Sequence, residues 1–309
     1  MKELAKAVIR AGVRRLPWGA NEALLEAICS RMGAEAVMAR SATQLNYLHL
    51  CADGKYGLMQ SSLNDGLLLP TYGRAGTYDE DMATLFREFF ARHGGGTYLD
   101  IGANIGLTII PIAIDPKVKC LAFEPDPLNN RHLRANVQRN CRNGNVEIHQ
   151  VALFSSRTKL RFVLNDQNIG DHRVDPDGHA TGHAVEVAAV PLDEFIESLD
   201  GAVAAKIDTQ GAEPFVIAGG GTALSRASLI VLEFSPYHMR ALGGNPRVVL
   251  EFLAGFDLIG LRPVRGSGIP ASQPAAEAIR FLEDRLSDWK DGDETYWDVF
   301  ASRESLPGS

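Results

Sequence analysis

The chain has 309 residues, of which 45% are hydrophobic and 22% charged, as is typical of a globular protein with one or two domains. Its formal net charge of −7 argues against a nucleic-acid-binding protein, because such proteins usually carry a basic domain or stripe. None of the four cysteines forms a Cys-x-x-Cys pair, and no apolar run is long enough to span a membrane. We therefore expect free thiols in a reducing compartment, which favours a cytoplasmic protein.

Residues 1–77 are predicted to form an N-terminal extension of helices and a small β element. Residues 1 to about 40 predict helices that are interrupted at Pro17–Gly19. The first is amphipathic and has a basic face, which fits either a membrane-surface helix or a packing helix with a solvated face. It is not a signal peptide, because basic residues interrupt its apolar run. A homodimer formed through these helices is a further hypothesis.

Two turn signals follow, and they predict a hairpin of short strands within residues 45–75. Asp53-Gly54 and Asn64-Asp65-Gly66 separate the apolar runs that begin at Tyr47 and Leu67. Residues 78–93 then predict a helix, since their apolar positions recur every three or four residues, and Gly94–Gly96 end it.

From Thr97 onward strands and helices alternate, which predicts a single α/β domain over residues 78–309. Strands are expected at 97–101, 118–123, 145–153, 203–208 and 228–234, and helices at 104–114, 127–140, 191–199 and 212–219. Such alternation predicts a mostly parallel sheet with helices on both faces. An antiparallel pair, 256–261 and 296–301, completes seven strands. An insertion at about 155–190 reads as a hairpin (159–164 and 184–190) around a polar loop.

A glycine turn follows the first strand of this domain. The run TYLDIGANIG places Asp100 at the strand end, followed by Gly102, Asn104 and Gly106. A strand, a glycine turn and a helix start bring a nucleotide-like ligand onto backbone amides. The middle glycine of the dinucleotide motif is missing, which disfavours a nicotinamide enzyme. An acid before the turn suits a cationic ligand such as S-adenosylmethionine, which carries an ammonium and a sulfonium.

The second strand also ends in an acid, Glu124, within LAFEPDP. It lies roughly twenty residues beyond the turn, where Rossmann-like folds place a carboxylate on ribose hydroxyls. We therefore predict that Glu124 binds the ribose; the alternative is a solvated strand end.

A third motif completes a family resemblance. Lys206-Ile207-Asp208 ends a strand and Gln210-Gly211 turns. Together with LDIGANIG, LAFEPDP, VPLDEF and VLEFSP, this run resembles the FkbM-type family of S-adenosylmethionine-dependent methyltransferases, over about residues 78–236. Many relatives carry Asp-Val-Glu-Gly where this chain has Asp208-Thr209-Gln210-Gly211, so any contact made by that glutamate is in question here.

The resemblance implies a Rossmann-like class I methyltransferase fold and S-adenosylmethionine as methyl donor, with S-adenosylhomocysteine as product. It implies O-methylation of a hydroxyl on a small molecule, a sugar or glycan, or another secondary metabolite. The donor would be held by Asp100, Gly102, Asn104, Gly106, Glu124 and Asp208. Ala152 or Gln150 would approach the adenine, and Glu80, or less favourably Tyr78, the methionine end.

Asp208 and His172 are the candidate catalytic residues. Asp208 lies at the carboxyl end of a core strand, where a base would take the acceptor proton; it could equally cap the turn or hold the methionine ammonium. His172 lies in the insertion loop beside Asp171, which would orient its ring, and Arg173, which would bind the acceptor. The alternative for these three residues is a solvated loop.

Glu233 and His238 follow the fifth strand and are candidate acceptor-binding residues; for Glu233 a backbone-bonded strand end is the alternative. No metal-ligand spacing is visible, so no metal site is predicted. Two other functions remain open: a methyltransferase acting on nucleic acid or protein, although no basic groove or Asn-Pro-Pro-Tyr motif is visible, and a cofactor-binding module without turnover.

Overall fold

The computed structural model describes residues 35–39, 47–62, 65–163, 173–174, 184–264, 266–288 and 295–305. The helices predicted before residue 35 therefore lie outside the described residues. Among the described residues, no helix is both long enough and apolar enough to cross a membrane.

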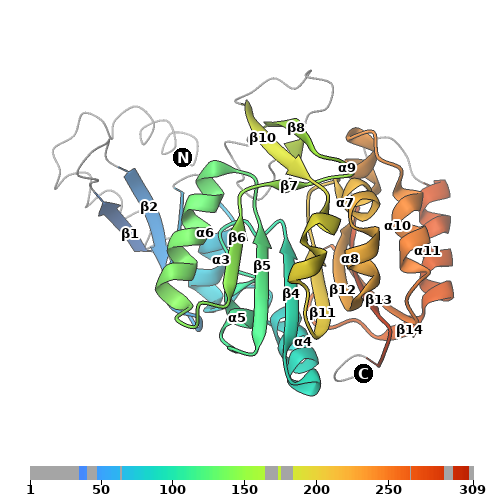
Figure 1. Cartoon of the computed structure of the whole chain (residues 1–309), viewed down its shortest axis with the longest axis horizontal. Coiled ribbons are helices and arrows are strands. Elements are labelled where there is room, and N and C mark those ends of the chain that lie inside the picture. Colours follow the sequence, from blue (N-terminus) through green and yellow to red (C-terminus); the bar gives the residue numbers. More distant parts are fainter. Residues whose placement is uncertain are drawn as a thin grey trace.

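The described residues contain a mostly parallel central sheet, in the order β14-β13-β15-β12-β11-β4-β5-β6 (Figure 1). Its parallel part consists of β4 (Gly96–Ile101), β5 (Val118–Phe123), β6 (Val146–His149), β11 (Ala202–Ile207) and β12 (Ala227–Phe234). The predicted edge pair is β13 (Leu258–Pro263) and β15 (Trp297–Ser302), and the two strands are antiparallel. The α/β class is confirmed. An eighth strand, β14 (Ser272–Pro274), has only three residues and too little pattern to predict.

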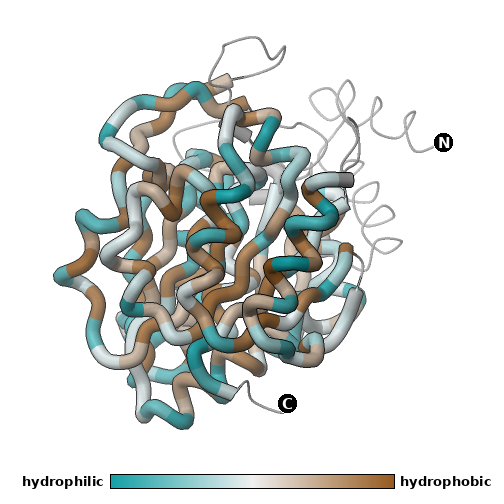
Figure 2. Tube along the Cα trace, turned by 90° about the vertical axis from the view of Figure 1, so that its right-hand side faces the viewer, coloured by the Kyte–Doolittle hydropathy of each residue, from teal (hydrophilic) through white to brown (hydrophobic). Residues whose placement is uncertain are grey.

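Helices cover both faces of this sheet because its buried strands present apolar side chains on both sides. On one face Tyr98 of β4 packs with Phe86 of α4 (Glu80–His93) and Leu133 of α6 (Pro127–Asn140). The neighbouring Leu99 belongs to the other face, where the core residues come from η1 (Leu192–Ser198), α7 (Glu213–Gly219), α8 (Gly221–Ser225), α9 (Pro236–Ala241), α10 (Pro246–Leu253) and α11 (Ala275–Asp288). Figure 2 shows hydrophobic segments in the interior and hydrophilic ones at the outer turns.

Two predicted helices are shorter or tighter in the structure. The helix expected at 104–114 is reduced to α5 (Ile110–Ala113), because Asn104 and Gly106 adopt positive φ angles of 48° and 95°. Residues with positive φ interrupt a right-handed helix. The segment at 191–199 is the 3₁₀ helix η1.

The insertion forms a second sheet, in the order β7-β10-β8-β9. Its predicted hairpin is confirmed: β8 (Thr158–Val163) pairs antiparallel with β10 (Ala184–Val190). The predicted strand 145–153 is wrong as a single strand, because it divides into β6 and β7 (Ala152–Leu153), and β7 pairs with β10. The chain thus crosses from the central sheet to the insertion sheet at residues 150–151.

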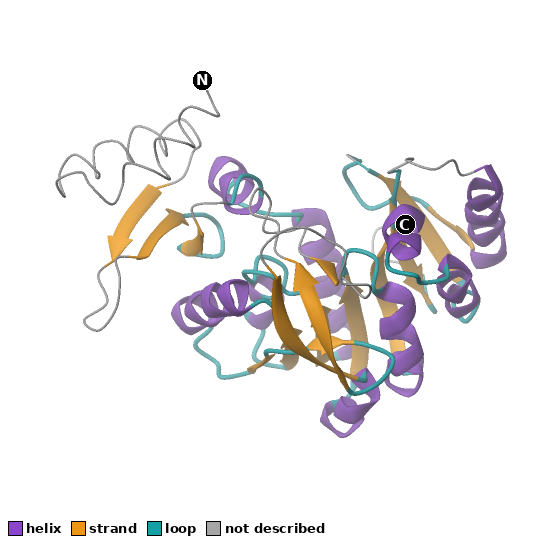
Figure 3. Cartoon of the chain, turned by 90° about the horizontal axis from the view of Figure 1, so that it is seen from above, coloured by secondary structure: helices purple, strands orange, loops and turns teal. Residues whose placement is uncertain are grey.

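A three-stranded antiparallel sheet precedes the α/β domain at one end of the molecule (Figure 3). It consists of β1 (Glu35–Ala39), β2 (Tyr47–Ala52) and β3 (Met59–Ser62), so the helical prediction is wrong for residues 35–39.

The run that begins at Leu67 is also not a strand, because it enters α3 (Leu68–Ala75). The Asp65 carboxylate accepts hydrogen bonds from the backbone N–H groups of Leu67, Leu68 and Leu69 at 3.1, 2.8 and 3.0 Å, which satisfies donors at the helix start.

Candidate active site

The carboxyl ends of β4, β5, β11 and β12 open onto one cavity of about 470 Å³. This is the edge at which open α/β sheets bind their ligands. The cavity is closed on one side by Phe162 of the insertion sheet and on another by Arg262 and Tyr296 from the antiparallel edge of the central sheet.

Gly102 and Gly106 have different structural roles. Gly102 lines the cavity with a φ of +83°, and a Cβ there would lie 1.9 Å from the carbonyl oxygen of Asp208. Glycine is therefore required because the ends of β4 and β11 lie against each other. Gly106 does not line the cavity; its Cβ would lie 2.9 Å from Leu133 of α6. The predicted donor contact of Gly106 is thus replaced by a packing role.

Glu124 is held at the cavity by backbone hydrogen bonds. The N–H groups of Asn104 and Asp126 each donate to one of its carboxyl oxygens at 2.8 Å. Its side chain is almost completely buried, and this burial raises its pKa to about 8. A carboxyl group has about four acceptor positions, so lone pairs remain for a ligand. Glu124 and Asn104 both line the cavity, and their binding of a cofactor stays a prediction.

Asp100 lies beneath the cavity rather than in it. It is fully buried, accepts a hydrogen bond from the Thr108 hydroxyl at 2.6 Å, and lies 3.5 Å from the ammonium of Lys206. Burial raises the pKa of Asp100, and the charge of Lys206 opposes that shift. The prediction that Asp100 meets a cationic ligand directly is therefore corrected: its charge is matched inside the protein.

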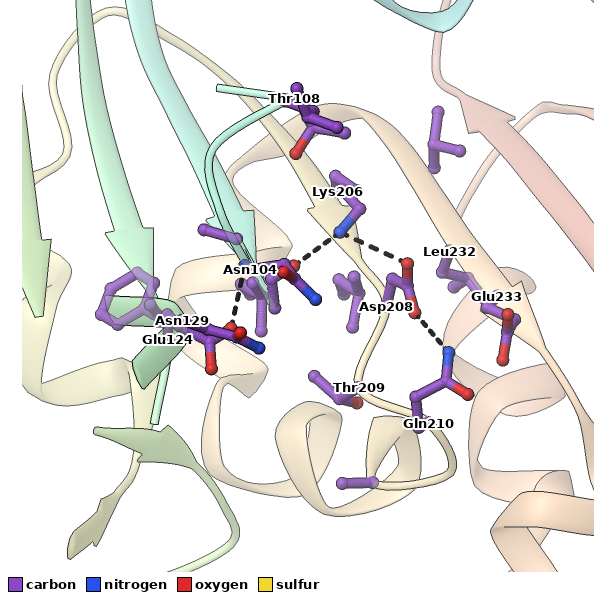
Figure 4. Close-up of a pocket in the computed structure, with 18 of the residues that line it drawn as sticks. Asn104, Thr108, Glu124, Asn129, Lys206, Asp208, Thr209, Gln210, Leu232 and Glu233 are labelled. Atoms are coloured by element: carbon purple, nitrogen blue, oxygen red, sulfur yellow. Dashed lines mark hydrogen bonds and ion pairs between the residues drawn. The ribbon is translucent and has the colours of Figure 1, made fainter. Parts of the chain in front are cut away.

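Lys206 was not predicted as a site residue. Its ammonium donates to the carbonyl oxygen of Gly102 at 2.8 Å and lies 3.5 Å from the buried Asp100. It also lies 3.5 Å from Asp208 (Figure 4). Burial lowers its pKa, but the charges of Asp208 and Asp100 outweigh burial and leave it raised. The signal was present in the sequence, because positions 206 and 208 of the predicted strand 203–208 are expected to point to the same side.

Asp208 lines the cavity with 40% of its side chain exposed. One carboxyl oxygen lies near Lys206 and the other accepts a hydrogen bond from the Gln210 amide at 2.9 Å (Figure 4). The following turn is held by Glu213 instead, whose carboxylate accepts from the N–H and the hydroxyl of Thr209. Asp208 therefore does not cap this turn.

Glu233 and His238 both line the cavity, and their binding of an acceptor stays a prediction. Each side chain is 12% exposed, and Oε1 of Glu233 lies 3.8 Å from Nδ1 of His238. Burial, followed by the charges of Asp208 and Asp298, raises the pKa of Glu233 well above its usual range.

An ionic cluster that sequence reasoning missed lies beside these residues. The Arg262 guanidinium donates to both carboxyl oxygens of Asp79, at 3.0 and 2.5 Å, and to Asp298 at 3.0 Å. Asp79 and Arg262 are far apart in the sequence, so only the assembled sheet reveals the pair. Tyr78, the less favoured candidate for the methionine end, lines the cavity next to Asp79.

The Glu80 side chain points away from the cavity. Its carboxylate binds Lys55 at 2.6 Å, Arg87 at 2.8 Å and the Tyr56 hydroxyl, and it does not line the cavity. Burial would raise its pKa, but these hydrogen bonds lower it to about 2. The predicted contact of Glu80 with the donor is corrected, because the side chain joins α4 to the segment after β2.

The remaining predicted residues divide between the cavity and the undescribed part of the chain. Ala152 lines the cavity with Phe123, Val151 and Phe162, whereas Gln150 does not. Asp171 and His172 lie outside the described residues. Arg173 lies in the short strand β9 (Arg173–Val174), and its side chain is outside the described part. Where side chains are described, no three His, Cys, Asp or Glu residues are grouped to hold a metal ion.

Comparison with known proteins agrees with this geometry. A family model described as the methyltransferase FkbM domain matches residues 100–258, just over half of the chain. The chain is 26% identical over 186 residues to the 2-O-methyltransferase NoeI of Sinorhizobium fredii (strain NBRC 101917 / NGR234), and the match covers 53% of this chain and 74% of that protein.

Two solved methyltransferase structures are among those that match the chain. A methyltransferase FkbM from Methylobacillus flagellatus KT matches with a TM-score of 0.39 and 20% identity, covering 54% of this chain and 40% of that one. A putative O-methyltransferase from Klebsiella pneumoniae matches with a TM-score of 0.38 and 12% identity, covering 74% and 85%.

Proposed function

Since the chain belongs to the FkbM methyltransferase family, we propose that it transfers a methyl group from S-adenosylmethionine to a hydroxyl group of a small molecule or glycan. The observation that carries this proposal is the single cavity that joins Glu124, at the end of β5, to Asp208 and Glu233 at the ends of β11 and β12. The carboxyl group proposed to bind the ribose and the carboxyl groups proposed to lie near the reacting atoms thus line the same cavity.

The residues around the cavity fit the methyl donor. Phe123, Val151, Ala152 and Phe162 offer an apolar wall for an adenine ring. Glu124 offers acceptor positions to two ribose hydroxyls. Asp208, which is partly exposed, offers a carboxylate to the methionine ammonium. We assign Asp208 this role rather than that of the base, because Lys206 and Gln210 already bind its two oxygens.

The bound donor supplies an activated methyl group on a sulfonium. The chain must then align the acceptor oxygen, exclude water and remove one proton. The acceptor half of the cavity is lined by Glu233, His238, Tyr296, Asp298 and Arg262. Carboxylates and a tyrosine hydroxyl are suitable partners for hydroxyl groups, and the relative NoeI is named a 2-O-methyltransferase.

Calorimetric titration of the chain with S-adenosylmethionine, S-adenosylhomocysteine and NAD tests the donor assignment. We expect binding of the two adenosyl ligands and none of NAD. A panel of methyl glycosides and hydroxylated metabolites, assayed by release of S-adenosylhomocysteine, then tests the acceptor class. Failure of both adenosyl ligands to bind would overturn the proposal, and binding without turnover of any acceptor would favour a cofactor-binding module.

A further inference from the structure

Glu233 differs from Asp208 and Glu124 in having a buried carboxyl oxygen without a hydrogen-bond partner among the described residues. It lies at the carboxyl end of β12, directly opposite Asp298 of β15. Its Oε1 atom is buried and has no hydrogen-bond partner among the described residues; the nearest basic group is His238, at 3.8 Å. By contrast, Asp208 and Glu124 each have both oxygens engaged.

The titratable and polar groups that face Glu233 come from every element packed around it. Burial, Asp208 and Asp298 disfavour its ionised form, whereas Lys206 and a hydrogen bond from Gln210 favour it. Asp208 and Lys206 face it from β11, Asp298 and Tyr296 from β15 and the residues before it, Gln210 and Glu213 from the turn and the start of α7, and His238 from α9. Burial acts most strongly, and acids outnumber cations among these neighbours. The raising contributions outweigh the lowering ones, and a positive charge that entered the cavity would lower the pKa of Glu233.

Methyl transfer from a sulfonium to a hydroxyl removes one positive charge and releases one proton. If a buried carboxylate takes that proton, the positive charge of the sulfonium and the negative charge of the carboxylate disappear in the same step. No new charge then remains in the cavity. Uncompensated charge in a dry site is costly, so this arrangement favours the reaction. Protonation of Asp208 would instead remove one of the partners that balance the charge of Lys206.

We propose that Glu233 accepts the proton of the acceptor hydroxyl and that the positive charge of the methyl donor is what ionises Glu233. This inference rests on the proposed function. The hydroxyl oxygen forms a bond to the methyl carbon, and the carbon–sulfur bond breaks with its electron pair kept by sulfur. The hydroxyl proton passes to the Glu233 carboxylate, which leaves a methyl ether, S-adenosylhomocysteine and a neutral Glu233 side chain.

Proton release on ligand binding tests this inference without any acceptor. Calorimetric titrations at pH 7, in two buffers with different ionisation enthalpies, count the protons released when S-adenosylmethionine or S-adenosylhomocysteine binds. The proteins compared are the wild type, Glu233→Gln and the control Glu251→Gln, which alters an exposed glutamate on α10. Ligand ionisation contributes equally in all three proteins, so the contribution of Glu233 is the difference between wild type and variant.

When S-adenosylmethionine binds, we expect the wild type and Glu251→Gln to release up to one more proton per molecule than Glu233→Gln. When S-adenosylhomocysteine binds, which has no sulfonium charge, we expect all three proteins to release the same number of protons. Equal proton release by wild type and Glu233→Gln, with both ligands bound, would overturn the inference and leave the proposed function intact. Absence of binding by both ligands to the wild type would overturn the proposed function and the inference with it.

Once an acceptor is known, turnover gives a second test. Glu233→Gln should lose about 10² to 10⁴-fold in kcat while its affinity for S-adenosylhomocysteine changes little, because a general base contributes in that range. A kcat within a few-fold of wild type would overturn the inference.

Discussion

Lys206 carries the positive charge on which the two aspartates of β4 and β11 depend. Asp100 is completely buried, and its carboxylate lies within ion-pair distance of Lys206. Removing one member of a buried ion pair leaves an uncompensated charge, whereas removing both members costs much less.

Lys206→Met should therefore lower the free energy of unfolding by about 3–5 kcal/mol. Adding Asp100→Asn in the same chain should restore most of this loss. Urea denaturation measures both, with Lys119→Met as the control, since Lys119 pairs with Glu147 at the surface. Equal losses in the single and double variants would show that Lys206 acts by packing rather than by charge.

At the same scale, Glu124 is expected to contribute directly to donor binding. Glu124→Ala should weaken the binding of S-adenosylmethionine and S-adenosylhomocysteine roughly thirtyfold, or about 2 kcal/mol, as expected for the loss of hydrogen bonds from two ribose hydroxyls to a buried carboxyl group. The exposed Glu147→Ala on β6 serves as the control in the same calorimetric titration. An unchanged Kd for Glu124→Ala would remove the ribose assignment.

At the scale of secondary-structure elements, the backbone after β4 packs closely against the backbone after β11 at Gly102. Gly102→Ala should reduce stability severely and abolish donor binding, because its Cβ would lie 1.9 Å from the Asp208 carbonyl and its φ is +83°. Gly144→Ala is a matched control: its φ is +67°, but a Cβ there meets nothing within 4 Å. Its cost should be about 1–2 kcal/mol, from the backbone alone. Similar thermal midpoints for the two variants would contradict the close approach.

The elements that sequence patterns predicted well are those with uninterrupted local signals. The helix at 127–140 is α6 residue for residue, because Asp126 caps its start and Pro127 suits its first position. The predicted strand 145–153 failed because β6 and β7 belong to different sheets, and no local signal marks that crossing. Leu67–Leu69 were misread because a short apolar run fits a strand or a helix equally well.

In the candidate site, too, the residues with a local sequence signal were the ones that could be predicted. The sequence could place Glu124, Asn104, Asp208, Glu233 and His238 near one edge of the sheet because each follows a readable strand, and all five line the cavity. Asp79, Arg262 and Asp298 were missed, since an ion pair between distant segments has no local pattern. Asp100 and Glu80 were assigned too directly to the ligand, because sequence does not reveal which buried acids are already paired inside the protein.

For the whole molecule, two buried glutamates predict how stability depends on pH. Burial raises the pKa of Glu124 to about 8 and that of Glu213 to about 7, from a usual 4.5. Between pH 4.5 and 8 the folded protein therefore holds protons on these groups that the unfolded chain has lost, so their contribution to stability falls as pH rises.

The free energy of unfolding, measured by urea denaturation from pH 7 to 8, should decrease with pH in the wild type. Below pH 7 the buried His132 opposes this trend, because burial lowers its pKa to about 4 and the unfolded chain then binds more protons. The slope should be smaller in Glu124→Gln and in Glu213→Gln. Glu80 does not interfere, because its pKa of about 2 confines its effect to pH values below about 4.5. A flat profile in the wild type would contradict the buried, proton-binding state of these two side chains.

The order of strands in the central sheet has a consequence for how the chain folds as it is synthesised. β13 is made before β15, yet β15 lies between β12 and β13 and is antiparallel to both. While the ribosome is still adding residues 264–296, the apolar edge of β12 has no neighbour and β13 has no place in the sheet. An unpaired apolar strand is prone to aggregate. The nascent chain therefore passes through a stage in which this edge of β12 is unpaired, and β15 completes the sheet only after residues 297–302 have been added.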